Sequence, residues 1–342
     1  MDFLAQLSEL KRQVDFNTYD ISVKELISMH EESIINIAPD YQRQFRWKDE
    51  RQSALIESIL LGIPTPSLYM ATNLDGTWEL IDGVQRLSTI IHFAGTPGAK
   101  RKILLDNSLV LTGLKKLSTF IGKSFEALPK TVQLDFLLKP MKVTTLSDKS
   151  DLQVRFDLFE RLNTGGIILS NQEIRSCVYR GAFNDFLKEL AKDQNYKKVV
   201  KVSSTQESDG TREEYVLRFF AYLNNYQNFE HSVVDFLNEF MGKATKKFDY
   251  KEGEYIFRET FRQLAGLPNG ITRGKGTTPA NLFEGIAVGA ALAIKEAGQL
   301  KLNNTREWIE GPELRYSTTG ATNSKPRVEH RIMYSKTKFL GL

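Results

Sequence analysis

The segment from Ile81 to Arg86 (Ile-Asp-Gly-Val-Gln-Arg) has the residue types and spacing in this sequence that are best suited to chemistry. A glycine turn leads there into a stretch whose apolar residues recur at helical spacing, so we expect a strand, a tight turn and a helix. The start of a helix offers unpaired backbone N–H groups and the positive end of the helix dipole. Both favour an anion such as phosphate.

Each polar group of this segment can take a part in phosphate chemistry. Gly83 would form the turn that cradles the anion, and Arg86 would add a bidentate contact to phosphate oxygens. Asp82 would hold a Mg²⁺ ion that bridges phosphates, or act as a base toward water. Gln85 would orient that water. Asp82, Gln85 and Arg86 are therefore our candidate catalytic residues, and Asp82 is the candidate metal ligand.

The same residues also fit an interpretation that needs no ligand. Asp82 followed three residues later by Gln85 is the pattern of a capping box, in which two side chains satisfy the N–H groups of a helix start. Arg86 would then be a solvated surface cation. On spacing alone this plain interpretation outweighs the functional one, because a helix-start signal accounts for much of the pattern.

Two further segments can contact a nucleotide. From Tyr41 to Trp47 two arginines, Arg43 and Arg46, alternate with three aromatic residues in an expected loop, which suits phosphate clamping with a base stacked on a ring. Aromatic anchoring of that loop on the core, with solvated arginines, is an equal alternative. The Gly-Gly pair that follows Asn163 permits close approach of a ligand, although such a sequence is more often a helix stop.

Several other chemistries have no signature in the sequence. It contains neither Gly-x-x-x-x-Gly-Lys-Ser/Thr nor Gly-x-Gly-x-x-Gly, and its four histidines show no metal-ligand spacing. The single cysteine, Cys177, excludes an internal disulfide and a cysteine-cluster zinc site, and we expect it in the core. The formal net charge of +4 would not by itself drive binding to nucleic acid.

The elements that position these segments are mixed up to residue 180 and helical afterwards. We expect a helical lead-in over residues 1–35, a hairpin of two strands and capping boxes at Ser170–Glu173 and Thr211–Glu214. We expect a solvated basic strip within 327–338 and a polar loop over 311–326. The expected ranges of the strands are 35–38, 67–71, 78–81, 104–106 and 142–146, and those of the clearest helices are 50–61, 151–162, 232–241 and 281–297.

No apolar stretch of the sequence is long enough to cross a membrane. The longest apolar stretch, 285–294, is about half of the roughly 20 residues required. The first residues lack a basic region ahead of an apolar one, so we expect no signal peptide. A cytoplasmic protein with no membrane partner is our expectation.

Taken together and in this order, these segments resemble the N-terminal domain of the GmrSD-type restriction endonucleases. The resemblance covers residues 20–180 and rests on 41–47, 58–64, 81–87 and 159–173. It implies a fold similar to that of ParB proteins and sulfiredoxin, with a nucleotide pocket at the turn before the signature helix. We therefore expect an α+β chain, with a ParB/sulfiredoxin-like nucleotide-binding domain over 1–180, which has a small mixed sheet, and an all-helical domain over 181–342.

The resemblance also assigns site residues. It places Gly83 and Arg86 in the signature pocket with Asp82 and Gln85, Arg43 on a facing loop, Arg46 as a second phosphate contact, and Asn163 along the same pocket. Val84 departs from the usual Asp-Gly-Gln-Gln-Arg signature, which implies weakened hydrolysis with retained binding. The comparable place in sulfiredoxin carries a reactive cysteine, so Val84 also implies that no thiol chemistry occurs here.

Studied members of the family bind and hydrolyse nucleoside triphosphates in anti-phage systems that restrict modified DNA. The resemblance thus implies a nucleotide-binding regulatory subunit that uses a nucleoside triphosphate with Mg²⁺ and acts with a separate nuclease or toxin. Whether this chain hydrolyses the triphosphate is open at this point. The family's fused nuclease half is missing, so we do not expect an independent nuclease. The alternative is a non-catalytic module that senses DNA or docks a partner, in which the helical half and the basic strip within 327–338 would carry the function. The oligomeric state is open.

Overall fold

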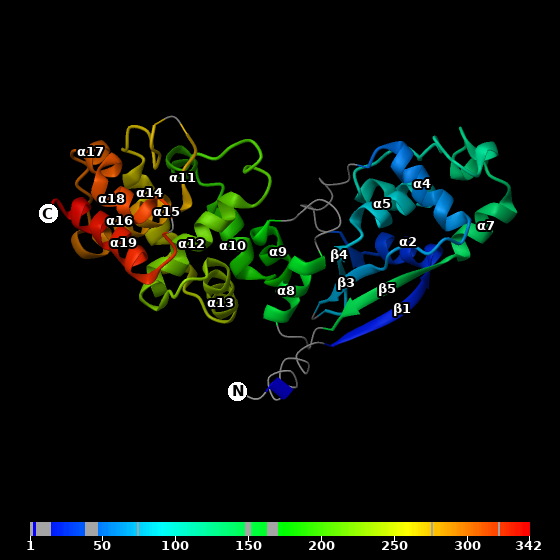
Figure 1. Cartoon of the computed structure of the whole chain (residues 1–342), viewed down its shortest axis with the longest axis horizontal. Coiled ribbons are helices and arrows are strands. Elements are labelled where there is room, and N and C mark those ends of the chain that lie inside the picture. Colours follow the sequence, from blue (N-terminus) through cyan, green and yellow to red (C-terminus); the bar gives the residue numbers. More distant parts are fainter. Residues whose placement is uncertain are drawn as a thin grey trace. The chain divides into compact units, whose positions relative to one another are not determined.

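A computed structural model describes residues 3–4, 15–37, 47–73, 75–147, 152–162, 170–274, 276–320 and 322–342, with only the backbone of 152–155 and 162 (Figure 1). The chain divides into two compact units, residues 1–168 and 169–342. The predicted boundary at residue 180 would assign helix α9 (Asn171–Val178) to the first domain, whereas this helix lies in the second unit.

The first unit is built on a five-stranded sheet in the order β1-β5-β3-β4-β2. The strands are β1 (Phe16–Ser22), β2 (Ile35–Asn36), β3 (Leu68–Thr72), β4 (Trp78–Asp82) and β5 (Pro140–Leu146). β1 is antiparallel to β5 and β3 to β4, whereas β3 is parallel to β5 and β2 to β4. The predicted hairpin and the α+β class with a small mixed sheet are confirmed.

Helices pack on this sheet and on one another. They are α2 (Val23–Glu31), α4 (Asp49–Leu60), α5 (Val84–Ala94), α6 (Pro97–Lys102), α7 (Lys130–Leu138) and α8 (Leu152–Leu162). α5 contacts both α2 and α4, and α8 contacts β4. Phe93 of α5 lies at the centre of an aromatic cluster, with ring centroids 5.5 Å from Phe125 and 5.3 Å from Phe136. This burial fixes α5, and with it the turn at its start.

Two expectations for the first unit were wrong. Residues 16–22 form a strand, β1, although a helical lead-in was predicted. Thr18, Tyr19 and Ile21 are residues that favour a pleated surface, and pairing along the whole of β5 outweighs any local helical pattern. The strand predicted at 104–106 is absent, because Leu104 adopts a positive φ of 60° just after α6 and turns the chain away.

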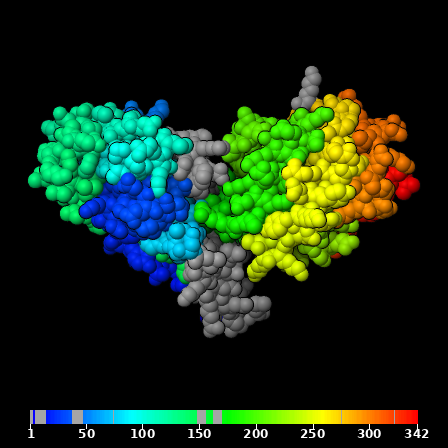
Figure 2. All heavy atoms as spheres, turned by 180° about the vertical axis from the view of Figure 1, so that it is seen from behind, coloured from blue at the N-terminus to red at the C-terminus, as the bar shows by residue number. Residues whose placement is uncertain are grey.

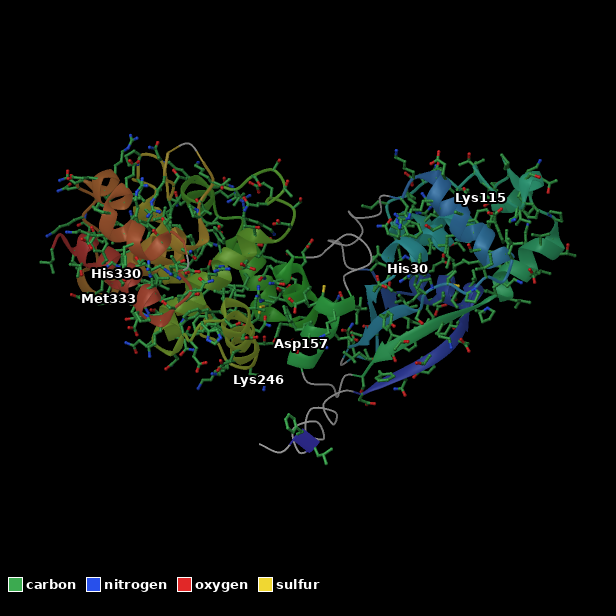
Figure 3. All side chains as sticks on the ribbon, viewed as in Figure 1. His30, Lys115, Asp157, Lys246, His330 and Met333 are labelled. Atoms are coloured by element: carbon green, nitrogen blue, oxygen red, sulfur yellow. The ribbon has the colours of Figure 1, made fainter. Side chains whose placement is uncertain are left out.

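Glu57 of α4 holds the segment that runs past this helix. Its buried carboxylate accepts hydrogen bonds from the backbone N–H groups of Lys115 at 3.2 Å, Lys116 at 2.7 Å and Leu117 at 2.9 Å. Lys115 lies beside α4 (Figure 3). The Leu117 N–H, followed by those of Lys116 and Lys115, keeps the pKa of the Glu57 carboxyl below its ordinary value despite burial.

All regular secondary structure among the described residues of the second unit is helical, as predicted for residues 181–342. Its helices are α9, α10 (Ala182–Leu190), α11 (Gln194–Val199), α12 (Thr211–Asn225), α13 (Val233–Lys246), α14 (Tyr250–Leu264), α15 (Ala280–Phe283), the π-helix η4 (Glu284–Val288), α16 (Gly289–Ala297), α17 (Thr305–Glu310), α18 (Pro312–Thr318) and α19 (Lys325–Leu340). In the space-filling view these segments pack without a break from green to red (Figure 2). The predicted buried helix at 281–297 is interrupted by the π turn.

Capping in the second unit follows the prediction at one helix and departs from it at another. Ser170 and Glu173 form a complete capping box at the start of α9. At the start of α12 the N-cap is Gly210, and no side chain caps the helix. The box predicted from Thr211 to Glu214 is wrong because the Glu214 carboxylate pairs instead with two arginines. Residues 311–326 were expected to be a loop but contain α18 and the start of α19.

A chain of ion pairs joins α9, α12, η4 and α19. Arg175 pairs with Glu214 at 2.9 Å, and Arg218 pairs with Glu214 at 2.7 Å and with Glu284 at 2.5 Å. Arg331 closes the chain by pairing with Glu284, and both of these side chains are completely buried. These ion pairs therefore hold together helices that are far apart in the sequence.

The basic strip expected within 327–338 is not a solvated face. Arg331 is buried in the ion-pair chain, and Lys336 pairs with Glu296 at 2.6 Å. The guanidinium carbon of Arg327 lies 4.0 Å from the centroid of the Tyr316 ring. Helical periodicity turns successive residues of α19 to different sides, so a run of cations in the sequence does not make one charged surface.

Candidate functional site

The turn between β4 and α5 requires a glycine. Gly83 has φ of 105° and ψ of 13°, a left-handed conformation that side chains with a Cβ rarely adopt. A Cβ at this position would also lie 2.4 Å from Cδ2 of Leu68, a completely buried residue of β3. The predicted strand, turn and helix are confirmed, and close packing against β3 is a second reason for the glycine.

No described side chain caps the start of α5. Its N-cap is Gly83, so the capping box predicted from Asp82 and Gln85 is wrong. The Asp82 carboxylate turns instead to Arg86, whose Nη2 lies 2.5 Å from Oδ2. The positive end of the α5 dipole therefore has no capping carboxylate or hydroxyl among the described residues, which suits an anionic ligand.

Arg86 is held in place and is not a solvated cation. Its side chain is only 13% exposed, and Nη2 donates a second hydrogen bond, of 3.2 Å, to the carbonyl oxygen of Ser67. Its Nε is buried and has no hydrogen-bond partner among the described residues. Buried donors are nearly always satisfied in folded proteins, so this guanidinium N–H beside an uncapped helix start can take an acceptor from a ligand or from water.

Gln85 has a backbone partner. Its Oε1 accepts a hydrogen bond of 3.1 Å from the N–H of Trp47. Trp47 ends the arginine-containing segment 41–47, so this bond attaches the end of that segment to the first turn of α5. The guanidinium carbon of Arg51 lies 4.5 Å from the centroid of the half-buried Trp47 ring.

The structure thus brings together Asp82, Gly83, Gln85 and Arg86 at one turn. Arg43, Arg46 and Asn163 lie outside the described residues, and their assignment stays a prediction.

Sequence reasoning missed two buried polar residues that connect to the site through Trp47. Gln52 of α4 and His92 of α5 are both buried, and His92 Nδ1 lies 2.8 Å from Gln52 Oε1. Burial lowers the pKa of His92, which favours the neutral ring. A signal existed for Gln52, because it stands at helical spacing from the apolar face formed by Leu55, Ile56 and Ile59.

Among the described ranges, no three histidine, cysteine, aspartate or glutamate side chains are grouped closely enough to hold a metal ion by themselves. A nucleotide-bound Mg²⁺ needs only one or two carboxylates in addition to phosphate oxygens. Asp82 fits that requirement, since its side chain is 34% exposed. None of the helices in the described part of the chain is both long enough and apolar enough to span a membrane.

Comparison with known proteins identifies the first part of the chain. Residues 23–180 match the family model described as GmrSD restriction endonuclease, N-terminal domain, which confirms the resemblance drawn from the motifs. The match includes the β4–α5 turn and extends through α9. No curated protein and no solved structure matched the chain.

Proposed function

Because residues 23–180 match the family model of GmrSD restriction endonuclease N-terminal domains, we propose that this chain is a nucleotide-binding regulatory subunit of a prokaryotic restriction or anti-phage system. The family match supports a role in restriction. The nucleotide, the regulatory role and a separate nuclease or toxin that executes the response are the parts we propose.

The observation that carries the nucleotide site is the uncapped start of α5 next to Arg86, whose buried Nε–H has no hydrogen-bond partner among the described residues. Backbone N–H groups of the first turn and the Arg86 guanidinium would share the negative charge of the phosphates. Asp82 keeps Arg86 oriented through the 2.5 Å pair. Arg43 and Arg46 would contribute from the segment that ends at Trp47.

Asp82 would also supply a carboxylate oxygen to nucleotide-bound Mg²⁺, while its other oxygen stays with Arg86. The ion would neutralise phosphate charge. If hydrolysis occurs, the contribution of this chain is the placement of charge around the phosphates, which carries most of the rate gain in phosphoryl transfer. Val84 is buried at the first position of α5, so it leaves no polar side chain at a place where the family usually has glutamine.

The direct test is binding of fluorescent ATP and GTP analogues to the full chain in the presence of Mg²⁺. Arg86→Ala should weaken binding at least about tenfold, or about 1.4 kcal/mol. Arg101→Ala is the matched control, because Arg101 is an exposed arginine of α6. Arg86 also bonds Asp82 and Ser67, so thermal unfolding is followed in parallel and Arg86→Lys, which keeps the charge, serves as a second variant.

Wild-type protein that binds neither analogue would refute the proposal, as would a folded Arg86→Ala protein that binds like the wild type. Phosphate release measured with Asp82→Asn separates the two parts of the proposal. Binding without turnover would establish a nucleotide sensor, whereas turnover that is lost in Asp82→Asn would establish a nucleotide hydrolase.

The alternative, a DNA-sensing or partner-docking module without nucleotide, relied in part on the basic strip of α19. That support is weaker in the folded chain, where Arg331 is buried and Lys336 is paired. Salt-dependent DNA binding that nucleotide does not change would favour this alternative.

A further inference from the structure

The peptide group of Trp47 is hydrogen-bonded on both sides by side chains from two helices. Its N–H donates to Oε1 of Gln85 on α5, at 3.1 Å. Its carbonyl oxygen accepts from Nε2 of Gln52 on α4, at 2.8 Å. Trp47 itself lies just before α4, which begins at Asp49. The backbone at this point is therefore fixed relative to α4 and to the start of α5.

The roles of the atoms in this arrangement follow from the carbonyl group of Trp47. A carbonyl oxygen can only accept, so the Gln52 atom that faces it must be the amide nitrogen. The other atom of that amide, Oε1, therefore faces His92 Nδ1 at 2.8 Å, and His92 must donate from Nδ1. A neutral His92 with its proton on Nδ1 thus orients Gln52, and Gln52 orients Trp47.

We propose that Gln52, Gln85 and His92 form a clamp on the Trp47 peptide, and that this clamp holds Trp47, the described end of the arginine segment 41–47, at the start of α5. The three side chains are positioning residues in this assignment. Gln85 would act by holding Trp47 rather than by orienting water. The consequence for nucleotide binding rests on the proposed function, whereas the clamp itself does not.

The burial of Gln52 is the reason to assign a function to the clamp. Gln52 is only 3% exposed and shares its helix face with the apolar Leu55, Ile56 and Ile59, and a buried amide is stable only where its hydrogen bonds are made. An apolar residue of the same size would fill that place in the core at no such risk. The amide makes specific use of its polarity because it fixes a peptide at the end of a charged segment.

The clamp is tested with Gln52→Leu and Gln85→Leu in the full chain. Both should speed hydrogen exchange of the Trp47 amide and trypsin cleavage after Arg46 by about tenfold or more, because each removes a bond that fixes this peptide. Gln85→Glu keeps an acceptor for the Trp47 N–H and should retain the protection. Gln133→Leu is the matched control, since Gln133 Nε2 donates to the carbonyl oxygen of Leu128, at 2.9 Å, elsewhere in the same unit.

Binding of the fluorescent ATP analogue with Mg²⁺ supplies the second readout. Gln52→Leu, a change in a buried side chain of α4, should weaken that binding about tenfold or more while the protein stays folded. Gln133→Leu should bind like the wild type.

Each outcome decides a separate point. Wild-type exchange and cleavage rates in folded Gln52→Leu and Gln85→Leu proteins would overturn the clamp. Faster exchange with unchanged affinity for the ATP analogue would overturn the role of the clamp in nucleotide binding. Wild-type protein that binds no nucleotide would overturn the proposed function instead, and the exchange and cleavage rates would still decide whether the clamp exists.

Discussion

Two separate features of the structure favour glycine at position 83: the backbone conformation and the packing against Leu68. The positive φ of 105° disfavours any side chain, and the buried Leu68 leaves no room for a Cβ. The first requirement belongs to the backbone alone, whereas the second comes from packing against β3. A substitution at this position therefore tests how tightly the turn is held against the sheet.

We expect Gly83→Ala to lower the free energy of unfolding by about 2–4 kcal/mol, from backbone strain and overpacking together. Gly76→Ala is the matched control, because Gly76 also has a positive φ, of 82°, but a Cβ added there would meet no neighbouring atom within 4 Å. It should cost about 1 kcal/mol. Urea unfolding of the two variants measures both values, and equal losses would show that the Leu68 contact has no energetic effect.

At the scale of elements, α4 fixes backbone outside helices and strands at two places, Trp47 and Lys115–Leu117. Gln52 holds the Trp47 peptide before the helix, and Glu57 holds the backbone from Lys115 to Leu117 beside it. Both side chains point inward from a helix whose other buried residues are largely apolar. Buried polar groups on α4 are thus used to fix neighbouring backbone, which apolar contacts do with less directional precision.

Glu57 gives this arrangement a pH dependence. Because its folded pKa lies below the ordinary glutamate value, its contribution to stability is full above that value and is lost as the pH falls through the folded pKa. Glu57→Gln would place an amide NH₂ against a backbone N–H. It should therefore destabilise the protein by about 1–3 kcal/mol at neutral pH.

Urea unfolding of the wild type and Glu57→Gln at about pH 7 and about pH 4 tests this sign. The difference between the two proteins should shrink at the lower pH, because protonation of Glu57 removes the same carboxylate that the substitution removes. A difference that stays constant or grows in acid would show that the three backbone bonds do not stabilise the charged form.

At the scale of the whole molecule, the second unit is held together by charge as well as by its aromatic core. Arg175 belongs to a helix that the family match includes, yet its partner Glu214 lies on α12, beyond that match. The ion-pair chain continues to Arg331, near the end of the described chain. The buried Arg175 of the last helix in the family region therefore takes its ion-pair partner from the helical remainder.

Loss of one of these buried ion pairs should lower the free energy of unfolding substantially. Arg331→Met would leave the completely buried Glu284 with one cation fewer, and we expect a loss of about 3–5 kcal/mol in the free energy of unfolding. Arg262→Met is the matched control, because the Arg262–Glu259 pair at 2.6 Å has an arginine that is 64% exposed, and it should change stability little. Calorimetry or urea unfolding compares the two variants. Similar losses would mean that the buried pair contributes no more to stability than the exposed pair.

The sequence by itself determined the strand, glycine turn and helix from Ile81 onward, the β3–β4 hairpin, the capping box at Ser170 and the helical second unit. These features depend on residues close together in the chain, whose periodicity and turn chemistry are readable without the fold. The same motifs were sufficient for the resemblance to GmrSD N-terminal domains, which the match over residues 23–180 confirms.

Only the tertiary structure decided which partner each polar side chain takes. Asp82 and Glu214 both stand where a capping residue would, yet each pairs with arginine because the fold brings that cation within hydrogen-bond distance. The burial of Arg331 and the bond between Gln52 and Trp47 have the same origin. A side chain near several possible partners bonds to whichever the packed chain presents, and residues distant in sequence set that choice.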